Sequence, residues 1–209
     1  ITFQSLADRI GPEKVIWRYD PIVLTEMIGT QFHIQTYQKI AEALCGYTHR
    51  SVISTVDIYR KLSSRLHRLS QQGIELINFN KLPGQQLEEL MCSLAQIAKE
   101  CGMEIRSCAE ELDLQSYGIL PGKCIDDDYI QKIFSMETVF KKDPSQRNLC
   151  KCVLSKDIGM YDSCLFGCQY CYANASFDLA RTHYEKHDPN SPSLLGWYEA
   201  EPGAKPGPG

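Results

Sequence analysis

Five of the ten cysteines lie in a short stretch near the C-terminus, and three of them have a spacing that suits a metal cluster. Cys164, Cys168 and Cys171 follow the pattern C-x3-C-x2-C. Thiolates are soft ligands that suit zinc and iron–sulfur clusters. Zinc modules usually present two C-x2-C pairs separated by a spacer, and this sequence lacks that symmetric pattern. We therefore predict that the three thiolates hold three irons of a cubane cluster and leave the fourth iron open.

Cys150 and Cys152 precede this triad and have three interpretations. They could ligate a second cluster, with Cys124 or Cys108 as further ligands. They could instead form a redox-active pair, or one of them could supply a fourth ligand to the first cluster and close its open iron. The sequence leaves these three interpretations open. A structural zinc or iron–sulfur site, or a set of reduced bystander cysteines, is the alternative for the stretch as a whole.

Composition sets limits on partners and compartment. The 209 residues carry a net charge of −4, which argues against broad nucleic-acid or membrane-surface binding. No apolar run approaches the roughly 18 residues of a membrane span, and the N-terminus does not resemble a signal peptide. Because clustered cysteines favour metal ligation in a reducing compartment, we expect a cytoplasmic protein. The chain begins with Ile rather than Met, as a fragment or processed protein would.

Three segments repeat one plan, in which a helix, a glycine and a short apolar strand follow one another. The first helix is expected to end near residue 10, and the second and third to span residues 31–45 and 85–101. The strands that follow them are expected at residues 15–19, 51–58 and 103–108. Alternating helices and strands imply parallel pairing and an α/β fold. Three strands cannot close an eight-stranded barrel, so we expect a partial or permuted TIM-like barrel, or one whose first strands precede Ile1.

The rest of the chain is expected to supply connections and a metal-binding segment. Residues 59–83 combine basic side chains with leucines at helical spacing, which favours an amphipathic helix with a solvated basic face over a cap for an anionic ligand. We expect loops at residues 109–122 and a short helix at 126–134. A strand at 152–160, a cluster loop at 161–171 and a final helix at 172–187 should follow. The predicted domains are an α/β core at residues 1–135, a cysteine-rich segment at 136–195 and a disordered tail at 196–209.

Each of the three predicted strands ends in polar side chains. Arg18 and Asp20 mark the end of the first strand, Asp57 that of the second, and Cys108, Glu110 and Glu111 that of the third. Strand carboxyl ends are where α/β barrels and open α/β sheets place their sites. We therefore expect Asp20, Asp57 and Glu110 to be catalytic and Arg18 to bind a cofactor or substrate carboxylate. The alternative for all of them is an ordinary ion pair or loop position.

The segment Cys164-Leu-Phe-Gly-Cys168-Gln-Tyr170-Cys171 resembles the radical S-adenosylmethionine (SAM) signature. The resemblance implies that the three cysteines hold a [4Fe-4S] cluster and that SAM chelates the fourth iron through its amino and carboxylate groups. It places Tyr170 beside the adenine, and Gly167 in the same cofactor-binding segment. In that superfamily the motif normally follows the first barrel strand. Here it comes last, so a barrel would have to be completed in permuted order.

The chain as a whole resembles the domain-of-unknown-function family numbered eighteen-forty-eight, an uncharacterised prokaryotic family. The stretches that carry the resemblance are Val15–Leu24, Cys108–Asp127, Asp157–Asn174 and Tyr184–Pro192, and it extends over residues 1–195. The C-terminal cysteines of this family have been likened to radical SAM clusters. Its members usually carry additional residues upstream.

These features together predict an iron–sulfur protein, most simply a radical SAM-like enzyme. It would cleave SAM to abstract hydrogen from an unknown small-molecule substrate, with a reductant such as flavodoxin or ferredoxin. The cofactor would carry the chemistry, while the protein binds, orients and excludes water. The alternatives are a non-catalytic iron–sulfur or zinc protein, in which the metal ties the C-terminal segment onto the core, and an electron-transfer partner.

Overall fold

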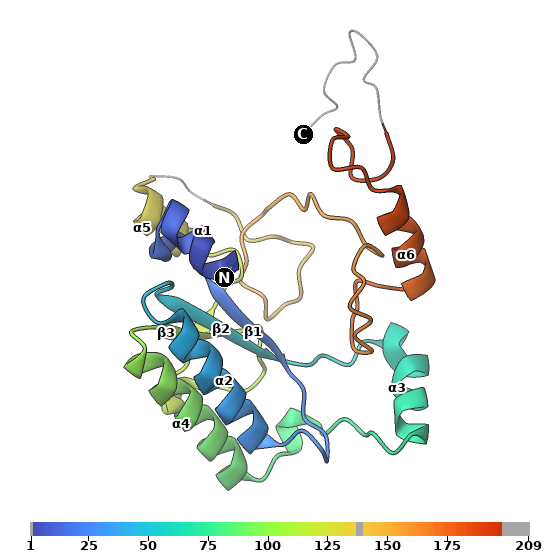
Figure 1. The fold of residues 1–209 in the computed structure, drawn as a ribbon. Helices are drawn as coiled ribbons and strands as arrows, with labels where there is room; N and C mark the ends of the chain where they lie inside the picture. The colour runs from blue at the N-terminus through green and yellow to red at the C-terminus, as the bar shows by residue number, and fades with distance from the viewer. Residues whose placement is uncertain (1, 137–139, 198–209) are drawn as a thin grey trace. The chain divides into compact units, whose positions relative to one another are not determined.

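The computed structural model describes residues 2–136 and 140–197 (Figure 1). Most of the tail predicted to be disordered therefore lies outside the described residues. No helix in the described ranges is long and apolar enough to span a bilayer.

Packing divides the chain into two compact units. The first, called here the sheet unit, comprises Ile1–Asp57 and Leu69–Ser155. The second, called the cysteine-loop unit, comprises Ile58–Arg68 and Lys156–Gly209. The predicted domain boundaries at residues 135 and 195 stay predictions.

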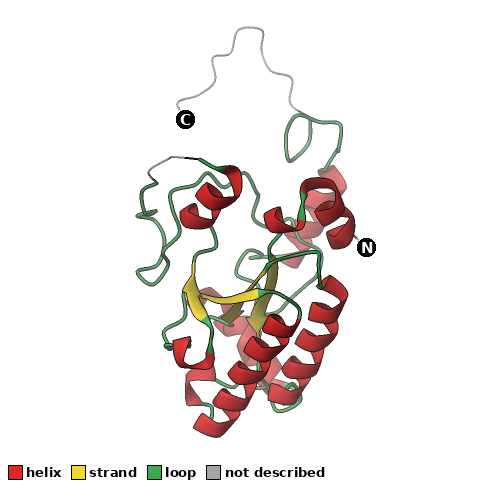
Figure 2. Ribbon diagram, turned by 90° about the vertical axis from the view of Figure 1, so that its left-hand side faces the viewer, coloured by secondary structure: helices red, strands yellow, loops and turns green. Residues whose placement is uncertain are grey.

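The sheet unit is built on a four-stranded parallel sheet in the order β1-β2-β3-β4. Helices α2 and α4 lie side by side on one face of it (Figures 1 and 2). Its elements are α1 (Thr2–Ile10), η1 (Pro12–Lys14), β1 (Trp17–Ile22), α2 (Thr30–Leu44), β2 (Arg50–Thr55), η3 (Phe79–Lys81), α4 (Gly84–Glu100), β3 (Glu104–Cys108), η4 (Gln115–Tyr117), β4 (Leu120–Gly122) and α5 (Asp127–Phe134).

The two faces of the sheet differ in chemistry because side chains alternate along a strand. Trp17, Ile53 and Ile105 point to the face covered by α2 and α4, where they form a core with the fully buried Tyr37 and Leu94. The intervening positions place charged and thiol side chains on the other face, among them Arg18, Asp20, Arg50, Glu104, Arg106 and Cys108. One face therefore stabilises the unit, and the other carries its reactive groups.

The predicted helix–strand rhythm is confirmed, with boundary shifts of one to three residues at most ends. The strand predicted at residues 15–19 is β1, which runs on through Pro21 to Ile22. The fourth strand, β4, was not expected because its Leu120-Pro121-Gly122 sequence is typical of a turn. Proline is tolerated there because β4 is an edge strand. The open sheet confirms the α/β class, while the partial or permuted barrel stays a prediction.

The strand predicted at residues 152–160 is wrong. Only Val153 takes part in an isolated antiparallel bridge, with Lys142, and the following residues have no regular structure. The Asp157 side chain accepts a hydrogen bond from the backbone N–H of Gly159 at 2.7 Å, so a local turn replaces strand pairing.

The cysteine-loop unit contains η2 (Arg60–Leu62), the start of α3 (Ser63–Gln71), and α6 (Phe177–Lys186), joined by a long irregular segment. Helix α6 begins later than the predicted residue 172. Ser176 is its N-cap, with its hydroxyl accepting from the Leu179 N–H at 3.2 Å. The expected amphipathic helix at residues 59–83 is confirmed as α3, although one of its basic residues, Arg65, is buried rather than solvated.

Candidate metal centre

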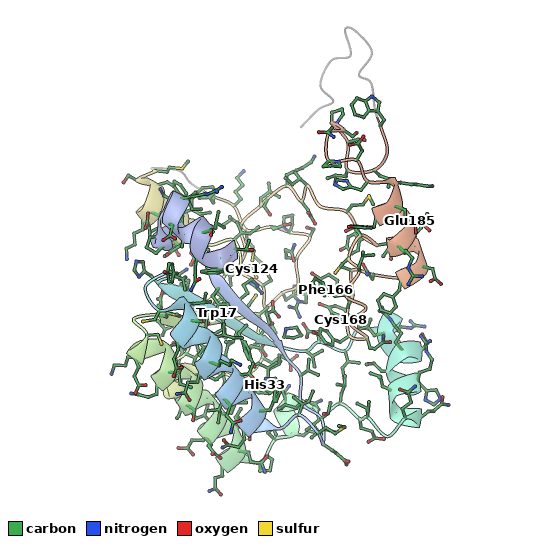
Figure 3. The ribbon with its side chains drawn as sticks, in the orientation of Figure 1. Trp17, His33, Cys124, Phe166, Cys168 and Glu185 are labelled. Carbon is green, nitrogen blue, oxygen red and sulfur yellow. The ribbon has the colours of Figure 1, made fainter. Side chains whose placement is uncertain are left out.

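Cys164, Cys168 and Cys171 lie on the irregular segment that precedes α6. Cys164 is exposed, and Cys168 and Cys171 are half-buried (Figure 3 labels Cys168). Two backbone features fold this cysteine loop back on itself. Gly167 has a φ of +70°, a left-handed conformation that favours glycine, and the N–H of Cys171 donates to the Cys168 carbonyl at 3.0 Å.

The three sulfurs of this loop do not converge at the spacing of a single metal ion. Among the described residues, only Asp126, Asp127 and Asp128 form a group of three possible metal ligands whose ligand atoms all lie within 4.8 Å of one another. The search covered His, Cys, Asp and Glu side chains. Thiolates on one tetrahedral zinc, at bond lengths of roughly 2.3 Å, would be about 4 Å apart. In a cubane each thiolate binds a different iron, so the sulfurs are held further apart. The three sulfurs are therefore not arranged as a single preformed zinc site.

Asn174 and Asp162 fix the two ends of the cysteine loop. The buried Asn174 side chain donates to the Cys164 carbonyl at 2.5 Å. The Asp162 N–H donates to the Ala173 carbonyl at 2.9 Å, and the Asp162 carboxylate accepts from the N–H groups of Ala175 and Ser176 at 2.6 and 3.0 Å. The loop is thus closed by polar bonds to the residues just before α6.

Arg65, on α3, holds the same loop by hydrogen bonds to its backbone. Its Nη2 donates to the carbonyls of Cys171 and Asn174, each at 2.8 Å, and its guanidinium carbon lies 5.3 Å from the centre of the Phe177 ring. The side chain is buried, yet its Nη1 has no hydrogen-bond partner, and neither has the buried Oδ1 of Asn174. Buried polar atoms without partners are uncommon, so the loop offers one donor and one acceptor that the protein itself does not use.

The predicted adenine neighbour, Tyr170, is half-buried between the second and third cysteines. The next aromatic residue, Tyr172, is exposed, with its ring centre 5.4 Å from that of Tyr59. Phe166 is 90% exposed (Figure 3). The loop therefore presents aromatic surface beside its thiols, although no ligand contact tests the predicted roles of Tyr170 and Gly167.

Arg18 and Asp20, both within β1, form the ion pair that is the alternative to their predicted roles. The Arg18 Nε donates to Asp20 Oδ2 at 3.2 Å, and the Arg18 Nη2 also pairs with that oxygen. The hydroxyl of Ser54, on β2, donates to the other Asp20 oxygen. Both charged side chains remain partly exposed, so they stay accessible to a ligand.

Asp57 and Glu110 have other partners. Asp57 forms an exposed ion pair with Arg147. The Glu110 carboxylate accepts from the N–H and the hydroxyl of Thr55, at 2.7 and 2.8 Å, which fixes the end of β2. Burial raises the pKa of Glu110 against the effect of these hydrogen bonds. The catalytic roles predicted for Asp20, Asp57 and Glu110 stay predictions.

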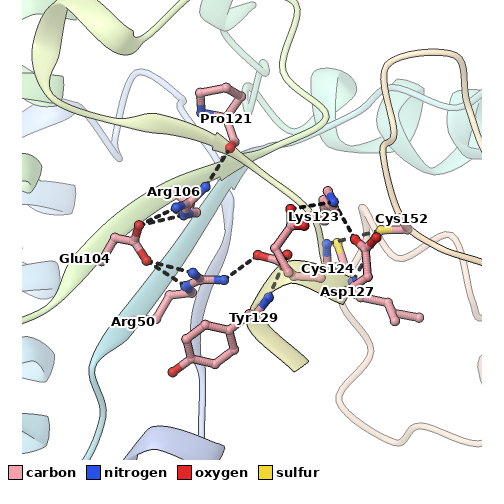
Figure 4. A network of polar contacts seen from close by, with 12 residues as sticks. Arg50, Glu104, Arg106, Pro121, Lys123, Cys124, Asp127, Tyr129 and Cys152 are labelled. Atoms are coloured by element: carbon pink, nitrogen blue, oxygen red, sulfur yellow. Dashed lines mark hydrogen bonds and ion pairs between the residues drawn. The ribbon is translucent and has the colours of Figure 1, made fainter. Parts of the chain in front are cut away.

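Cys150 and Cys152 lie in the sheet unit with Cys108 and Cys124, two cysteines that the sequence offered as possible further ligands. The Cys108 and Cys124 sulfurs are 2.7 Å apart, and the Arg18 Nη1 donates to Cys124 Sγ at 3.1 Å. Cys152 Sγ accepts from the Cys124 N–H at 3.1 Å, as Figure 4 shows. Cys150, two residues before Cys152, is also buried.

The three aspartates at the start of α5 all form ion pairs with basic side chains. Asp126 pairs with the buried Arg50 at 2.6 Å, and Lys123 pairs with both Asp127 and Asp128 (Figure 4). Arg50 also pairs with Glu104, at 2.8 Å. These carboxylates therefore serve the polar network on the second face of the sheet, and we assign them no metal.

Sequence reasoning missed the roles of Arg65 and Asn174. Arg65 is one of several basic residues at helical spacing, and nothing in the sequence separates it from Arg68. Asn174 follows the triad closely, so its proximity was a usable signal, but its bond to the Cys164 carbonyl depends on how the loop closes.

Comparison with known proteins places the chain in a family but assigns no activity. No curated protein and no solved structure matches it. A family model described as "Domain of unknown function (DUF1848)" matches residues 1–173, and the chain belongs to this family.

Proposed function

We propose that this family member is a radical SAM-like enzyme in which Cys164, Cys168 and Cys171 hold a [4Fe-4S] cluster with one iron open to SAM. One observation carries the proposal: the sequence of the cysteine-loop unit contains three cysteines and no fourth. The other seven cysteines all belong to the sheet unit. A structural cluster is normally held by four protein ligands, whereas three leave one iron for a cosubstrate.

The donor set of the loop fits this cofactor. Three thiols suit iron, and their sulfurs are not gathered at the spacing of ligands to a single ion. The cluster, when bound, would supply one electron to SAM, whose C5′–S bond then breaks to give methionine and a carbon radical that removes a hydrogen atom from the substrate.

The protein's own residues would hold and shield these groups. Arg65 fixes the carbonyls of Cys171 and Asn174 and keeps one buried N–H available for an acceptor such as a cluster sulfur or a carboxylate. Tyr170 would lie against the adenine, as its position in the motif implies. Arg18 and Asp20 stay candidates for binding a cofactor or substrate. In a barrel, the face of the sheet that carries them would point to the interior.

SAM turnover tests the proposal. The chain is reconstituted anaerobically with iron and sulfide, reduced, and incubated with SAM, and the products are separated by chromatography. We expect 5′-deoxyadenosine and methionine from the native chain and from Cys92→Ser, which alters an exposed cysteine on α4. We expect neither product from Cys168→Ser.

Two results would refute the enzymatic proposal. A reconstituted cluster that forms no 5′-deoxyadenosine would leave a non-catalytic iron–sulfur or electron-transfer protein. Stoichiometric zinc bound by the triad, with no iron taken up when iron is ample, would leave a structural zinc protein.

A further inference from the structure

The sheet unit gathers four cysteines that are far apart in the sequence. Cys108 ends β3, Cys124 follows β4 by two residues, and Cys150 and Cys152 lie in the irregular segment beyond α5. Three of the four are buried, and Cys124 is exposed. Contacts link three of them, from Cys108 to Cys124 and from the Cys124 backbone to Cys152, and Cys150 lies two residues before Cys152.

These sulfurs receive an unusual number of hydrogen bonds. Cys152 Sγ accepts from two consecutive backbone N–H groups, those of Cys124 at 3.1 Å and Ile125 at 3.4 Å. Cys124 Sγ accepts from the Arg18 guanidinium at 3.1 Å. A neutral thiol is a weak acceptor, whereas a metal-bound thiolate is commonly surrounded by such donors. Such donors would stabilise the negative charge of metal-bound thiolates.

The Cys108 and Cys124 sulfurs lie 2.7 Å apart, and both cysteines are free. Thiolates that share one tetrahedral metal are about 4 Å apart, so this pair would have to separate on metal binding, while a disulfide would bring the sulfurs closer. The N–H groups directed at Cys152 favour the metal, because a Cys108–Cys124 disulfide gives them no role.

The segment that contains Cys150 and Cys152 has little regular structure to hold it against the sheet. Its described residues from 140 to 155 are mostly exposed and form no helix or strand beyond the bridge of Lys142 with Val153. The buried side chains there are Asp143, Val153 and the two cysteines. The thiols are therefore the groups best placed to fix this segment to the carboxyl ends of β3 and β4.

We propose that Cys108, Cys124, Cys150 and Cys152 form a second centre, with four thiolate ligands, for a thiophilic metal. This chemistry is shared by zinc and by an iron–sulfur cluster. No three of the four sulfurs all lie within 4.8 Å of one another, so a single zinc ion would require the segment that carries Cys150 and Cys152 to move closer to β3 and β4. Each thiol gives up its proton on binding, and the charge of Arg18 partly offsets that of the thiolates. Four protein ligands leave no open position, so the centre ties the structure together or carries electrons rather than binding substrate. The proposal does not depend on the function of the C-terminal triad.

A chain without the triad tests it. The Cys164→Ala, Cys168→Ala, Cys171→Ala variant is purified anaerobically, and its zinc, iron and sulfide are measured before and after reconstitution with zinc or with iron and sulfide. We expect stoichiometric metal that is lost on adding Cys124→Ser and retained on adding Cys92→Ser. Sulfide together with iron identifies a cluster, and zinc alone identifies a zinc site. Failure of the triad proposal would leave these results unchanged.

Alkylation of the unmutated chain covers the case in which the variants do not fold. Metal should protect all four thiols from iodoacetamide, including the exposed Cys124, and metal removal should expose them, as read by mass spectrometry. The proposal is overturned if the triad-free chain binds none of the metals, if Cys124→Ser keeps its metal, or if a Cys108–Cys124 disulfide is found in place of the metal.

Discussion

The two groups of cysteines are held in different ways. Cys108 of the sheet unit is the last residue of a buried parallel strand, and Cys124 follows another strand of the same sheet. Cys164, Cys168 and Cys171 lie on a loop without helix or strand, shaped by turns and by bonds to Arg65 and Asn174. A hydrophobic core positions Cys108 and Cys124, whereas polar bonds position the triad.

This difference has an energetic consequence. The sheet unit buries Tyr37, Leu90, Met91 and Leu94 completely and needs no metal to form a core. Among the described residues of the cysteine-loop unit, Leu62 and Ala180 are the fully buried apolar side chains. Helix α6 of this unit has only ten residues. Short helices with little apolar burial are marginal in water. We infer that a bound metal would stabilise the second unit more strongly than the first.

The largest expected effect follows from removing the triad's metal. Cys168→Ser should unfold residues 156–197 locally and leave the β-sheet intact, because metal binding supports small metal-dependent folds by on the order of 10 kcal/mol. Hydrogen exchange read by mass spectrometry would show lost protection in that segment, with Cys92→Ser as the control. Unchanged hydrogen-exchange protection of α6 in the metal-free chain would contradict the inferred difference in metal dependence between the two units.

Removal of Arg50 should give the next largest effect, confined to the sheet unit. Arg50→Ala leaves Asp126 buried without its cation and deprives Glu104 of a partner, which should cost about 3–5 kcal/mol of the free energy of unfolding. Urea unfolding measures the loss. Arg106→Ala, at a more exposed site, should cost less. Equal costs would show that burial of the Arg50 pairs is unimportant.

A smaller effect should follow from changing Arg65, this time on the cysteine loop. Arg65→Gln removes the charged donor to the Cys171 and Asn174 carbonyls, so metal affinity of the triad should fall about 10–100-fold, as for other residues that support metal ligands. Competition with a chelator measures the affinity. Arg68→Gln, an exposed change on the same helix, should leave it unaltered. A matching loss in Arg68→Gln would point to general helix destabilisation instead.

The smallest expected effect concerns pH and the sheet unit. The buried ring of His33 contacts the Tyr19 hydroxyl and the Val23 carbonyl, both at 2.8 Å, and burial lowers its pKa against the effect of the carbonyl. The unfolded chain therefore binds a proton more readily, so stability should fall as pH drops below about 6.5, the ordinary histidine pKa. His33→Gln should lose less stability, by on the order of 1 kcal/mol, between about pH 7.5 and pH 5. Parallel pH profiles of the two chains, measured by urea unfolding, would exclude His33 as the cause.

The sequence allowed prediction of most of the sheet unit because periodic apolar residues and glycines mark the ends of its helices. It did not reveal β4, since Pro121 and Gly122 are turn residues and only the pairing of Leu120 with Arg106 makes this segment a strand. It gave the ligand spacing of the triad, because that spacing is local. The clustering of Cys108 and Cys124 with Cys152 depends on strand register, so the sequence offered it only as one of three interpretations.

Direct contact between SAM and the cluster is the central claim, and one measurement addresses it. The reconstituted, reduced native chain is mixed with SAM that is isotopically labelled in its amino group, and electron–nuclear double resonance is recorded on the cluster signal. The account predicts a coupling from the labelled amino group that is present in the native chain and in Cys92→Ser and lost with the cluster in Cys168→Ser. A well-formed triad cluster whose signal is unchanged by SAM, with no coupling to the label, would contradict it.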